Sequence, residues 1–324
     1  MGIMSLTEIM DKAIDIHKKY IKTTAVFVLV FGIISMIVMG FSAVIGGVVG
    51  VPIMMAGANW VVGAVLLTIF MMVIMGIILC KNVGLTEIFN QEFTKKNINM
   101  DKAISSSFKN MGKSIGVVFA GALLSLPAFI FFWFMGKFLF KQIDESLISA
   151  GVFGGIEIFL IIATVLFFIA VAAFIMWFLT IHIFTIHVIT LENKSLFKAL
   201  KRSRQLVKQN FWRILGSLIM CNLVVSAISL SIYTIFGTLG GLIILLLKFL
   251  SMDTDMLALV TVIFNLLQYP LNIIVSLFIS PLGWTLVSLL YYNQLFKKEG
   301  YDLELRLKEV EKINCERKPL SEGI

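Results

Sequence analysis

Residues 156–190 have the sequence IEIFLIIATVLFFIAVAAFIMWFLTIHIFTIHVIT, and residues 191–213 continue with LENKSLFKALKRSRQLVKQNFWR. The first stretch can cross a bilayer, because about 20 apolar helical residues span roughly 30 Å of hydrocarbon. The second stretch carries seven Lys and Arg residues, and cationic loops beside spans are retained in the cytoplasm. This change from apolar to cationic sequence predicts a membrane-spanning segment and its orientation.

The same alternation runs through the whole chain. Of 27 Lys and Arg residues, 24 lie in four segments, residues 1–23, 81–113, 191–213 and 293–324. With all four segments inside, we expect an all-α multi-pass protein of a bacterial plasma membrane with both termini cytoplasmic. The expected six spans are about 25–45, 60–80, 115–138, 156–180, 212–236 and 257–292. They form a membrane domain, residues 1–292, followed by an amphipathic tail, residues 293–324, with a helix around Tyr301–Ile313. Residues 45–59, uncharged and rich in glycine, form either an outer loop or a re-entrant segment.

The amino-acid composition of the chain indicates which kinds of partner it binds. The chain is 59% hydrophobic, whereas soluble domains are about 45–50% apolar. Its net charge of +8 therefore favours membrane lipids with anionic headgroups as partners, and not nucleic acid. A protein partner in the membrane is a further expectation. No disulfide framework is expected, because Cys80 and Cys315 would lie on the cytoplasmic side and Cys221 within a span.

A short repeat precedes each odd-numbered span. The tripeptide Lys-Ala-Ile/Leu occurs at residues 12–14, 102–104 and 198–200. Each copy begins an amphipathic helix typical of the membrane interface. The predicted apolar faces are Leu6, Ile9, Ala13, Ile16 and Tyr20; Ile104, Phe108, Met111 and Ile115; and Leu196, Leu200, Ser203, Val207 and Phe211. The repeat predicts three helix-hairpin units with threefold pseudo-symmetry, although basic amphipathic entries to unrelated spans would look the same.

Catalytic signatures are scarce. The expected bilayer centres hold no Asp, Glu, Lys or Arg, which intramembrane chemistry normally requires. His182 and His187 have no carboxylate at ligand spacing and are interpreted as packing residues at the interface. We find no zinc-protease, serine-hydrolase or phosphate-loop motif. We therefore expect no enzyme, no catalytic residues, no metal and no cofactor.

Polar side chains follow one face of each of the last two spans. Steps of three and four residues place them on common helical faces. They are Asn222, Ser226, Ser229 and Tyr233 in the fifth span, and Thr261, Asn265, Gln268, Asn272, Ser276 and Ser280 in the sixth. They are explained either by hydrogen bonds between helices or by a hydrophilic substrate path.

The third basic segment is a candidate contact for lipid phosphate, besides its role in orientation. Near an anionic leaflet each cation contributes about 1 kcal/mol to binding. The candidate contacts are Lys198, Lys201, Arg202, Arg204, Lys208 and Arg213.

Two stretches carry a family resemblance. They are Leu191-Glu192-Asn193 with Ala199-Leu200-Lys201-Arg202-Ser203 and Leu206-Val207-Lys208-Gln209-Asn210-Phe211-Trp212-Arg213, and Tyr291-Tyr292-Asn293 with Lys298-Glu299-Gly300-Tyr301-Asp302-Leu303-Glu304. Here the chain resembles the group related to the membrane domain of glycerophosphoryl diester phosphodiesterases, common in Gram-positive bacteria. That family usually has Asp where Asn293 stands. The catalytic and metal-binding residues of the phosphodiesterase domain have no counterparts here, so the resemblance implies a membrane module without that activity.

We therefore expect a non-enzymatic membrane protein that handles or translocates a lipid or another headgroup-bearing envelope substrate. The two polar faces would form the path, and the third basic segment would attract phosphate. The alternative is a membrane subunit or scaffold whose partner supplies ATPase or hydrolase activity.

Overall fold

The computed structural model describes residues 4–45, 60–94, 97–149, 155–250 and 254–301, together with Leu303, Glu304 and Leu307. These residues form helices without any strand, as predicted: α1 (Leu6–Ile45), α3 (Trp60–Phe93), α4 (Met100–Lys109), α5 (Met111–Ser149), α6 (Gly155–His182), α7 (Thr185–Leu191), α8 (Leu196–Lys208), α9 (Phe211–Phe249) and α10 (Thr254–Glu299). The segment 45–59 and the tail helix around Tyr301–Ile313 lie largely outside the described residues.

The prediction of six spans is confirmed. Six helices of the described chain are long and apolar enough to cross a membrane: Leu6–Phe41, Leu67–Phe93, Met111–Gln142, Ile158–Leu191, Phe211–Phe249 and Val262–Glu299. These helices extend beyond the predicted spans at the ends that are expected to be cytoplasmic. The second span, expected to end at residue 80, is helical to Phe93 because Val83, Leu85 and Ile88 are fully buried against neighbouring helices. Tertiary packing, absent from a hydropathy pattern, extends this helix.

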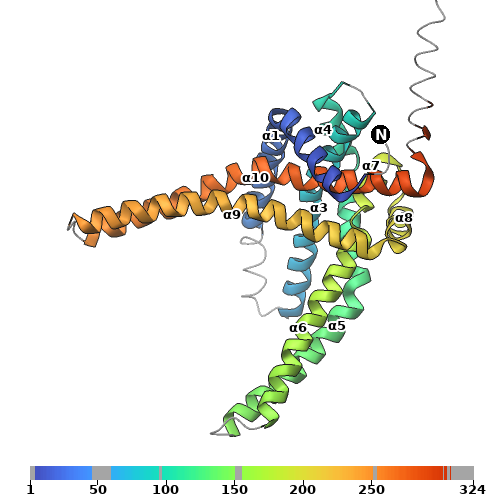
Figure 1. The fold of residues 1–324 in the computed structure, drawn as a ribbon. Coiled ribbons are helices and arrows are strands. Elements are labelled where there is room, and N and C mark those ends of the chain that lie inside the picture. The colour runs from blue at the N-terminus through green and yellow to red at the C-terminus, as the bar shows by residue number, and fades with distance from the viewer. Residues whose placement is uncertain are drawn as a thin grey trace, which may run out of the picture.

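The molecule consists of hairpins joined at one end. The antiparallel pairs α5–α6 and α9–α10 extend in different directions from a common base (Figure 1). We define the base as α1 up to Tyr20, α4, α7, α8, residues 81–93 of α3 and residues 282–299 of α10. Many of the largest fully buried side chains lie there. In contrast, none of the most apolar stretch of α6 is buried, as expected of helices that face lipid.

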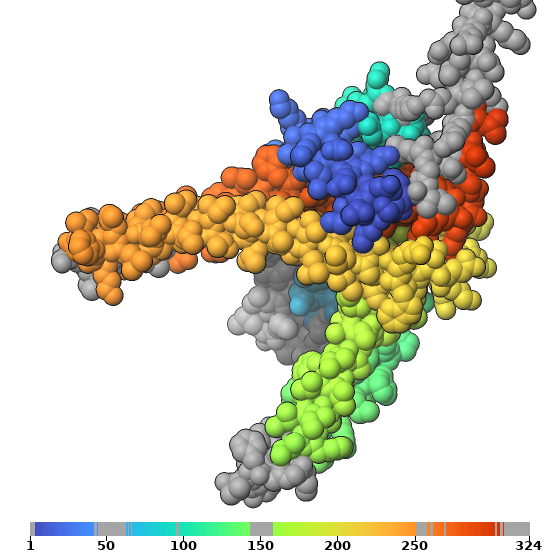
Figure 2. Space-filling view, in the orientation of Figure 1, coloured from blue at the N-terminus to red at the C-terminus, as the bar shows by residue number. Residues whose placement is uncertain are grey.

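Two of the three predicted amphipathic faces are buried in the base. In α1 the predicted face includes Ile9 and Ala13, both buried, and non-helical dihedrals at Tyr20 (φ −115°, ψ 16°) separate this part from the span. Figure 2 shows it lying against the α9–α10 pair. The face of α8 is likewise buried at Leu200 and Val207.

The apolar face predicted for α4 is not the face that α4 buries in the base. Phe108 is 50% exposed, whereas Ala103 and Ser107 are fully buried. The reason is the close approach of α4 to α3 at Gly84, where an added Cβ would lie 2.4 Å from Ser107 Oγ. Only small side chains fit such a contact, so the larger apolar residue faces outward.

The three amphipathic helices are arranged in a cyclic order. The alanine of each Lys-Ala-Ile/Leu copy, Ala13, Ala103 and Ala199, has an exposure of 0%. The helices carrying them pack on α10, α3 and α7, respectively. Each therefore packs on the second span of the preceding unit, or on its extension α7, and the first packs on the last. This packing follows the threefold order that the repeat predicts.

Candidate functional site

The two stretches that carry the resemblance meet in the base, at Glu192. This carboxylate, just past α7, accepts a hydrogen bond from Tyr291 Oη at 2.8 Å and forms ion pairs with Lys194 and Arg202. Asn193 has a φ of +53°, the left-handed conformation in which asparagine often ends a helix. Burial acts to raise the pKa of Glu192, but its hydrogen bonds with Lys194 and Tyr291 and the charge of Arg202 outweigh it and lower that pKa. Glu192 is thus held as an anion.

The same network neutralises one of the predicted phosphate contacts. Arg202 also forms an ion pair with Glu299 at the end of α10, and Asn210 Nδ2 donates to Gln294 Oε1 at 3.0 Å. These contacts fasten α8 and the start of α9 to α10. Because its guanidinium is shared by two carboxylates, Arg202 is not included in the candidate site.

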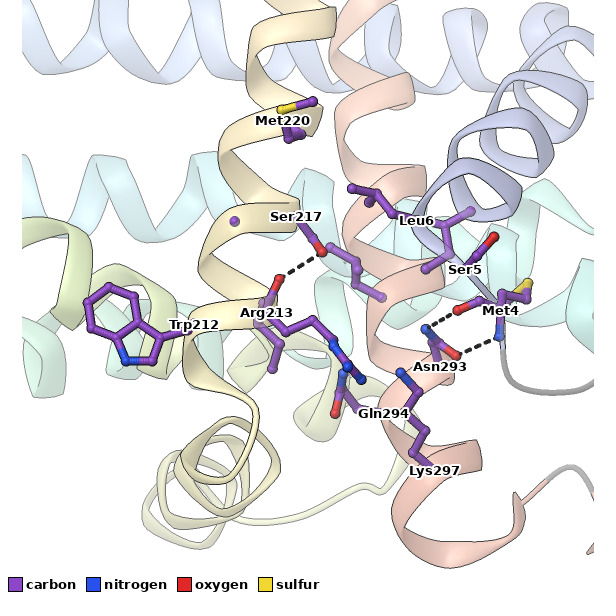
Figure 3. Close-up of a pocket in the computed structure, with 14 residues that line it drawn as sticks. Met4, Ser5, Leu6, Trp212, Arg213, Ser217, Met220, Asn293, Gln294 and Lys297 are labelled. Atoms are coloured by element: carbon purple, nitrogen blue, oxygen red, sulfur yellow. Dashed lines mark hydrogen bonds between the residues drawn. The ribbon is translucent and has the colours of Figure 1, made fainter.

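A cavity of about 570 Å³ lies beside this network, between the start of α1, the start of α9 and the end of α10. Figure 3 shows its lining side chains. They are Met4, Ser5, Leu6, Ile9, Trp212, Arg213, Ile214, Gly216, Ser217, Met220, Leu290, Asn293, Gln294 and Lys297. We call it the cationic pocket, because Arg213 and Lys297 are its charged residues.

The two cations have no anionic partner in the described part of the chain. Neither Arg213 nor Lys297 forms an ion pair there, although both side chains line the same cavity. The other polar groups are largely paired: Asn293 is bonded to the backbone of Met4, and Ser217 Oγ donates to Arg213 O at 2.8 Å. The pocket therefore holds an excess of positive charge that an anion would neutralise.

The rest of the pocket wall is apolar. Leu6, Ile9 and Met220 line it, and Trp212 at its rim is 81% exposed, as is usual for tryptophan at a membrane interface. A pair of cations beside an apolar wall suits an amphiphile with an anionic headgroup.

The predicted phosphate contacts are distributed over two surfaces. Arg213 lines the cationic pocket, whereas the remaining lysines and Arg204 are exposed along α8: Lys198, Lys201, Arg204 and Lys208. Sequence analysis missed Lys297, because it belongs to a different basic segment and lies 84 residues after Arg213. Only the packing of α10 beside α9 brings it to Arg213.

The predicted path residues are mostly exposed on the α9–α10 hairpin. The exposed ones are Asn222, Ser226, Asn265, Gln268, Asn272 and Ser276, and Ser229 and Tyr233 are partly buried. The side chain of Thr261 lies outside the described residues. Asn222 and Ser280 line a second cavity, of about 560 Å³, between α3, α6, α9 and α10. The two polar faces thus contribute to one cavity at the basal end of the hairpin.

The two histidines pack as the sequence suggested. His187 is fully buried between the rings of Trp284 and Tyr291, with centroids 5.0 and 5.2 Å away. Its Nε2 lies 2.9 Å from Ser288 Oγ, and that hydroxyl is also within 3.0 Å of Trp284 O. His182 contacts the ring of Phe178. Across the described ranges, no group of three His, Cys, Asp or Glu side chains is arranged to hold a metal.

Comparison with known families gives one match. The family model described as the membrane domain of glycerophosphoryl diester phosphodiesterase matches residues 156–318, half of the chain. The matched residues include α6 to α10 and so contain the Glu192 network, Arg213 and Lys297. No curated protein and no solved structure matches the chain.

Proposed function

This multi-pass chain belongs to the family of the membrane domain of glycerophosphoryl diester phosphodiesterase, and on that premise we propose that it binds an anionic lipid by its headgroup and handles it without catalysis. The proposed site is the cationic pocket. In this proposal the base faces the bacterial cytoplasm, in keeping with the basic segments gathered there.

The observation that carries this proposal is that Arg213 and Lys297 line one cavity and form no ion pair in the described part of the chain. Arg213 is exposed and Lys297 is half-buried, so a headgroup can reach both cations, and a guanidinium and an ammonium together suit a phosphate group. The apolar wall of Leu6, Ile9 and Met220 would accommodate the first part of an acyl chain. Headgroup and chain would then be held on different sides of one pocket.

The test compares two double variants of equal charge. Arg213→Gln/Lys297→Gln removes the pocket cations, and Lys201→Gln/Lys208→Gln removes two exposed cations of α8. Purified protein in neutral detergent is titrated with phosphatidylglycerol, and bound lipid is counted by native mass spectrometry. At about 1 kcal/mol per cation, the pocket variant should bind about thirtyfold more weakly. Equal losses of affinity in both double variants would show that general surface charge causes the effect, and would contradict the proposal.

A scaffold role is the second candidate, favoured by the exposed polar side chains of the α9–α10 hairpin. Exposed amides are costly in hydrocarbon, and a protein partner could satisfy them. Native mass spectrometry of the protein extracted gently from its own membrane separates the two functions. A stoichiometric protein partner favours a subunit, whereas a monomer or homo-oligomer with one enriched anionic lipid favours lipid handling.

A further inference from the structure

The second cavity contains a cation that sequence analysis did not select. Lys81 lies on α3 within the span Leu67–Phe93, and its side chain lines the cavity. Its Nζ donates a hydrogen bond to Ser280 Oγ of α10 at 3.0 Å. Throughout the described ranges it forms no ion pair with a carboxylate. Lys81 is the first residue of the part of α3 that belongs to the base, and a cation that lines a cavity without a carboxylate partner in the described ranges is a candidate ligand contact.

The cavity lies where the second spans of the three units meet. Lys81, Thr180 and Ser280 line it from α3, α6 and α10, the second spans of the three units. The contact between α3 and α10 continues further into the base, where Trp284 Nε1 donates to Thr86 Oγ1 at 2.9 Å. The single charge is therefore at the centre of the helix assembly and not at its lipid-facing edge.

The other walls define what could bind. α9 contributes Asn222 and the apolar Leu218, and α6 contributes the apolar Met176 and Leu179. Among the lining residues Lys81 is the one charged side chain, beside hydroxyl and amide groups. A volume of about 560 Å³ is within the range of about 300–1,000 Å³ of ligand pockets. The chemistry suits one negative charge on an apolar molecule.

We infer that this cavity binds a lipid through one singly charged oxyanion, a phosphodiester or a carboxylate, with Lys81 as its counter-ion. Ser280 and Asn222 supply hydrogen bonds, and Leu218 and Met176 contact the acyl chain. The site is separate from the cationic pocket, because the two cavities use different residues of α9 and α10. The inference is based on Lys81 and the cavity around it, and it does not depend on the proposed function.

The experiment uses the purified full chain in neutral detergent, titrated separately with phosphatidylglycerol, oleate and zwitterionic phosphatidylcholine. Bound lipid is counted by native mass spectrometry. Lys81→Gln should weaken binding of one anionic lipid about tenfold or more, because a charge-assisted contact is lost. Lys81→Arg should restore binding, and Lys208→Gln, at an exposed position of α8, should leave it unchanged.

Two glycines provide a test that keeps Lys81 in place. Gly283 lines the second cavity, whereas Gly237 of α9 lines neither cavity, and a Cβ added at either meets nothing within 4 Å. Gly283→Leu should therefore fill part of the second cavity and abolish the Lys81-dependent binding. Gly237→Leu, at an exposed position, is the matched control, which should leave that binding unchanged.

The outcomes are distinct. Binding of phosphatidylglycerol or oleate that is lost in Lys81→Gln and Gly283→Leu supports the site, and the lipid that binds identifies the oxyanion. Unchanged binding in both variants, or equal binding of phosphatidylcholine, overturns it. A loss confined to Arg213→Gln/Lys297→Gln would overturn this inference while leaving the proposed function intact.

Discussion

Asn293 joins the beginning of the described chain to the end of its last span. Its Oδ1 accepts from Met4 N at 3.0 Å, and its Nδ2 donates to Met4 O at 3.0 Å. An amide can do both at once, whereas an ionised carboxylate has no donor. The aspartate usual in the resembling family would leave Met4 O facing a negative charge. The departure at this position therefore has a structural reason in this chain.

Asn293→Asp should lower the free energy of unfolding by about 1–3 kcal/mol, because one hydrogen bond of a buried group is replaced by a repulsion. Thermal unfolding in detergent measures the change. Asn97→Asp, at an exposed residue, is the control for added charge. Equal stabilities of both variants would show that the contact with Met4 contributes little.

At the scale of helices, the α9–α10 hairpin carries its polar face outward. The alternative explanation of this face, hydrogen bonding between helices, has little support within one chain. Among the stripe side chains that the structure describes, Ser280 is bonded to Lys81 of α3, and Ser229 Oγ is bonded to Val225 O of its own helix. The exposed amides of α10 remain available to a polar substrate or a partner.

The triple variant Asn265→Leu/Gln268→Leu/Asn272→Leu tests the path. Since these side chains are exposed, we expect the unfolding temperature to change by no more than a few degrees, as about 0.5 kcal/mol per surface substitution implies. Movement of fluorescent phosphatidylglycerol across proteoliposomes should be abolished. Alanine at Ile263, Leu267 and Ile274, exposed apolar residues of the same helix, is the control. Undiminished lipid movement in the triple variant would exclude this path.

For the whole molecule, the base is a ring of three similar contacts. Ala13, Ala103 and Ala199 are each fully buried, and each lies on an amphipathic helix that packs on the second span of the preceding unit. The last contact brings α1 onto α10, so the ring joins the two ends of the chain. Such an arrangement distributes stability over all three units.

Leucine at each of these alanines should destabilise the protein by about 1–3 kcal/mol, because an overpacked contact forces its neighbours apart. The expected losses of unfolding free energy are similar at all three positions. Asp15, Ser105 and Lys201 lie two residues further along each helix and are exposed, so leucine there is the matched control. Sensitivity at a single alanine would indicate that the three contacts are not equivalent.

The sequence predicted the helical phase where large apolar residues meet the core. Ile9 and Val207, two residues of the predicted apolar faces, are buried, because burying a large apolar side chain is strongly favourable whatever its neighbours are. The sequence did not reveal that α4 buries Ala103 and Ser107 while Phe108 stays half-exposed, because the packing of α4 is decided by Gly84 of α3, a residue on another helix. Close contacts between backbones select small side chains, and hydropathy does not reveal them.

The membrane class of the molecule and its six spans could be predicted because apolar length and cationic ends are local properties of a chain. Which cations are neutralised depends instead on how the helices pack. Arg202 and Arg213 belong to one basic segment, yet α10 places Glu299 beside the first and Lys297 beside the second. Lys81 likewise gained its cavity from three other helices. Charge is a property of a residue, but its partner is set by packing between residues far apart in the chain.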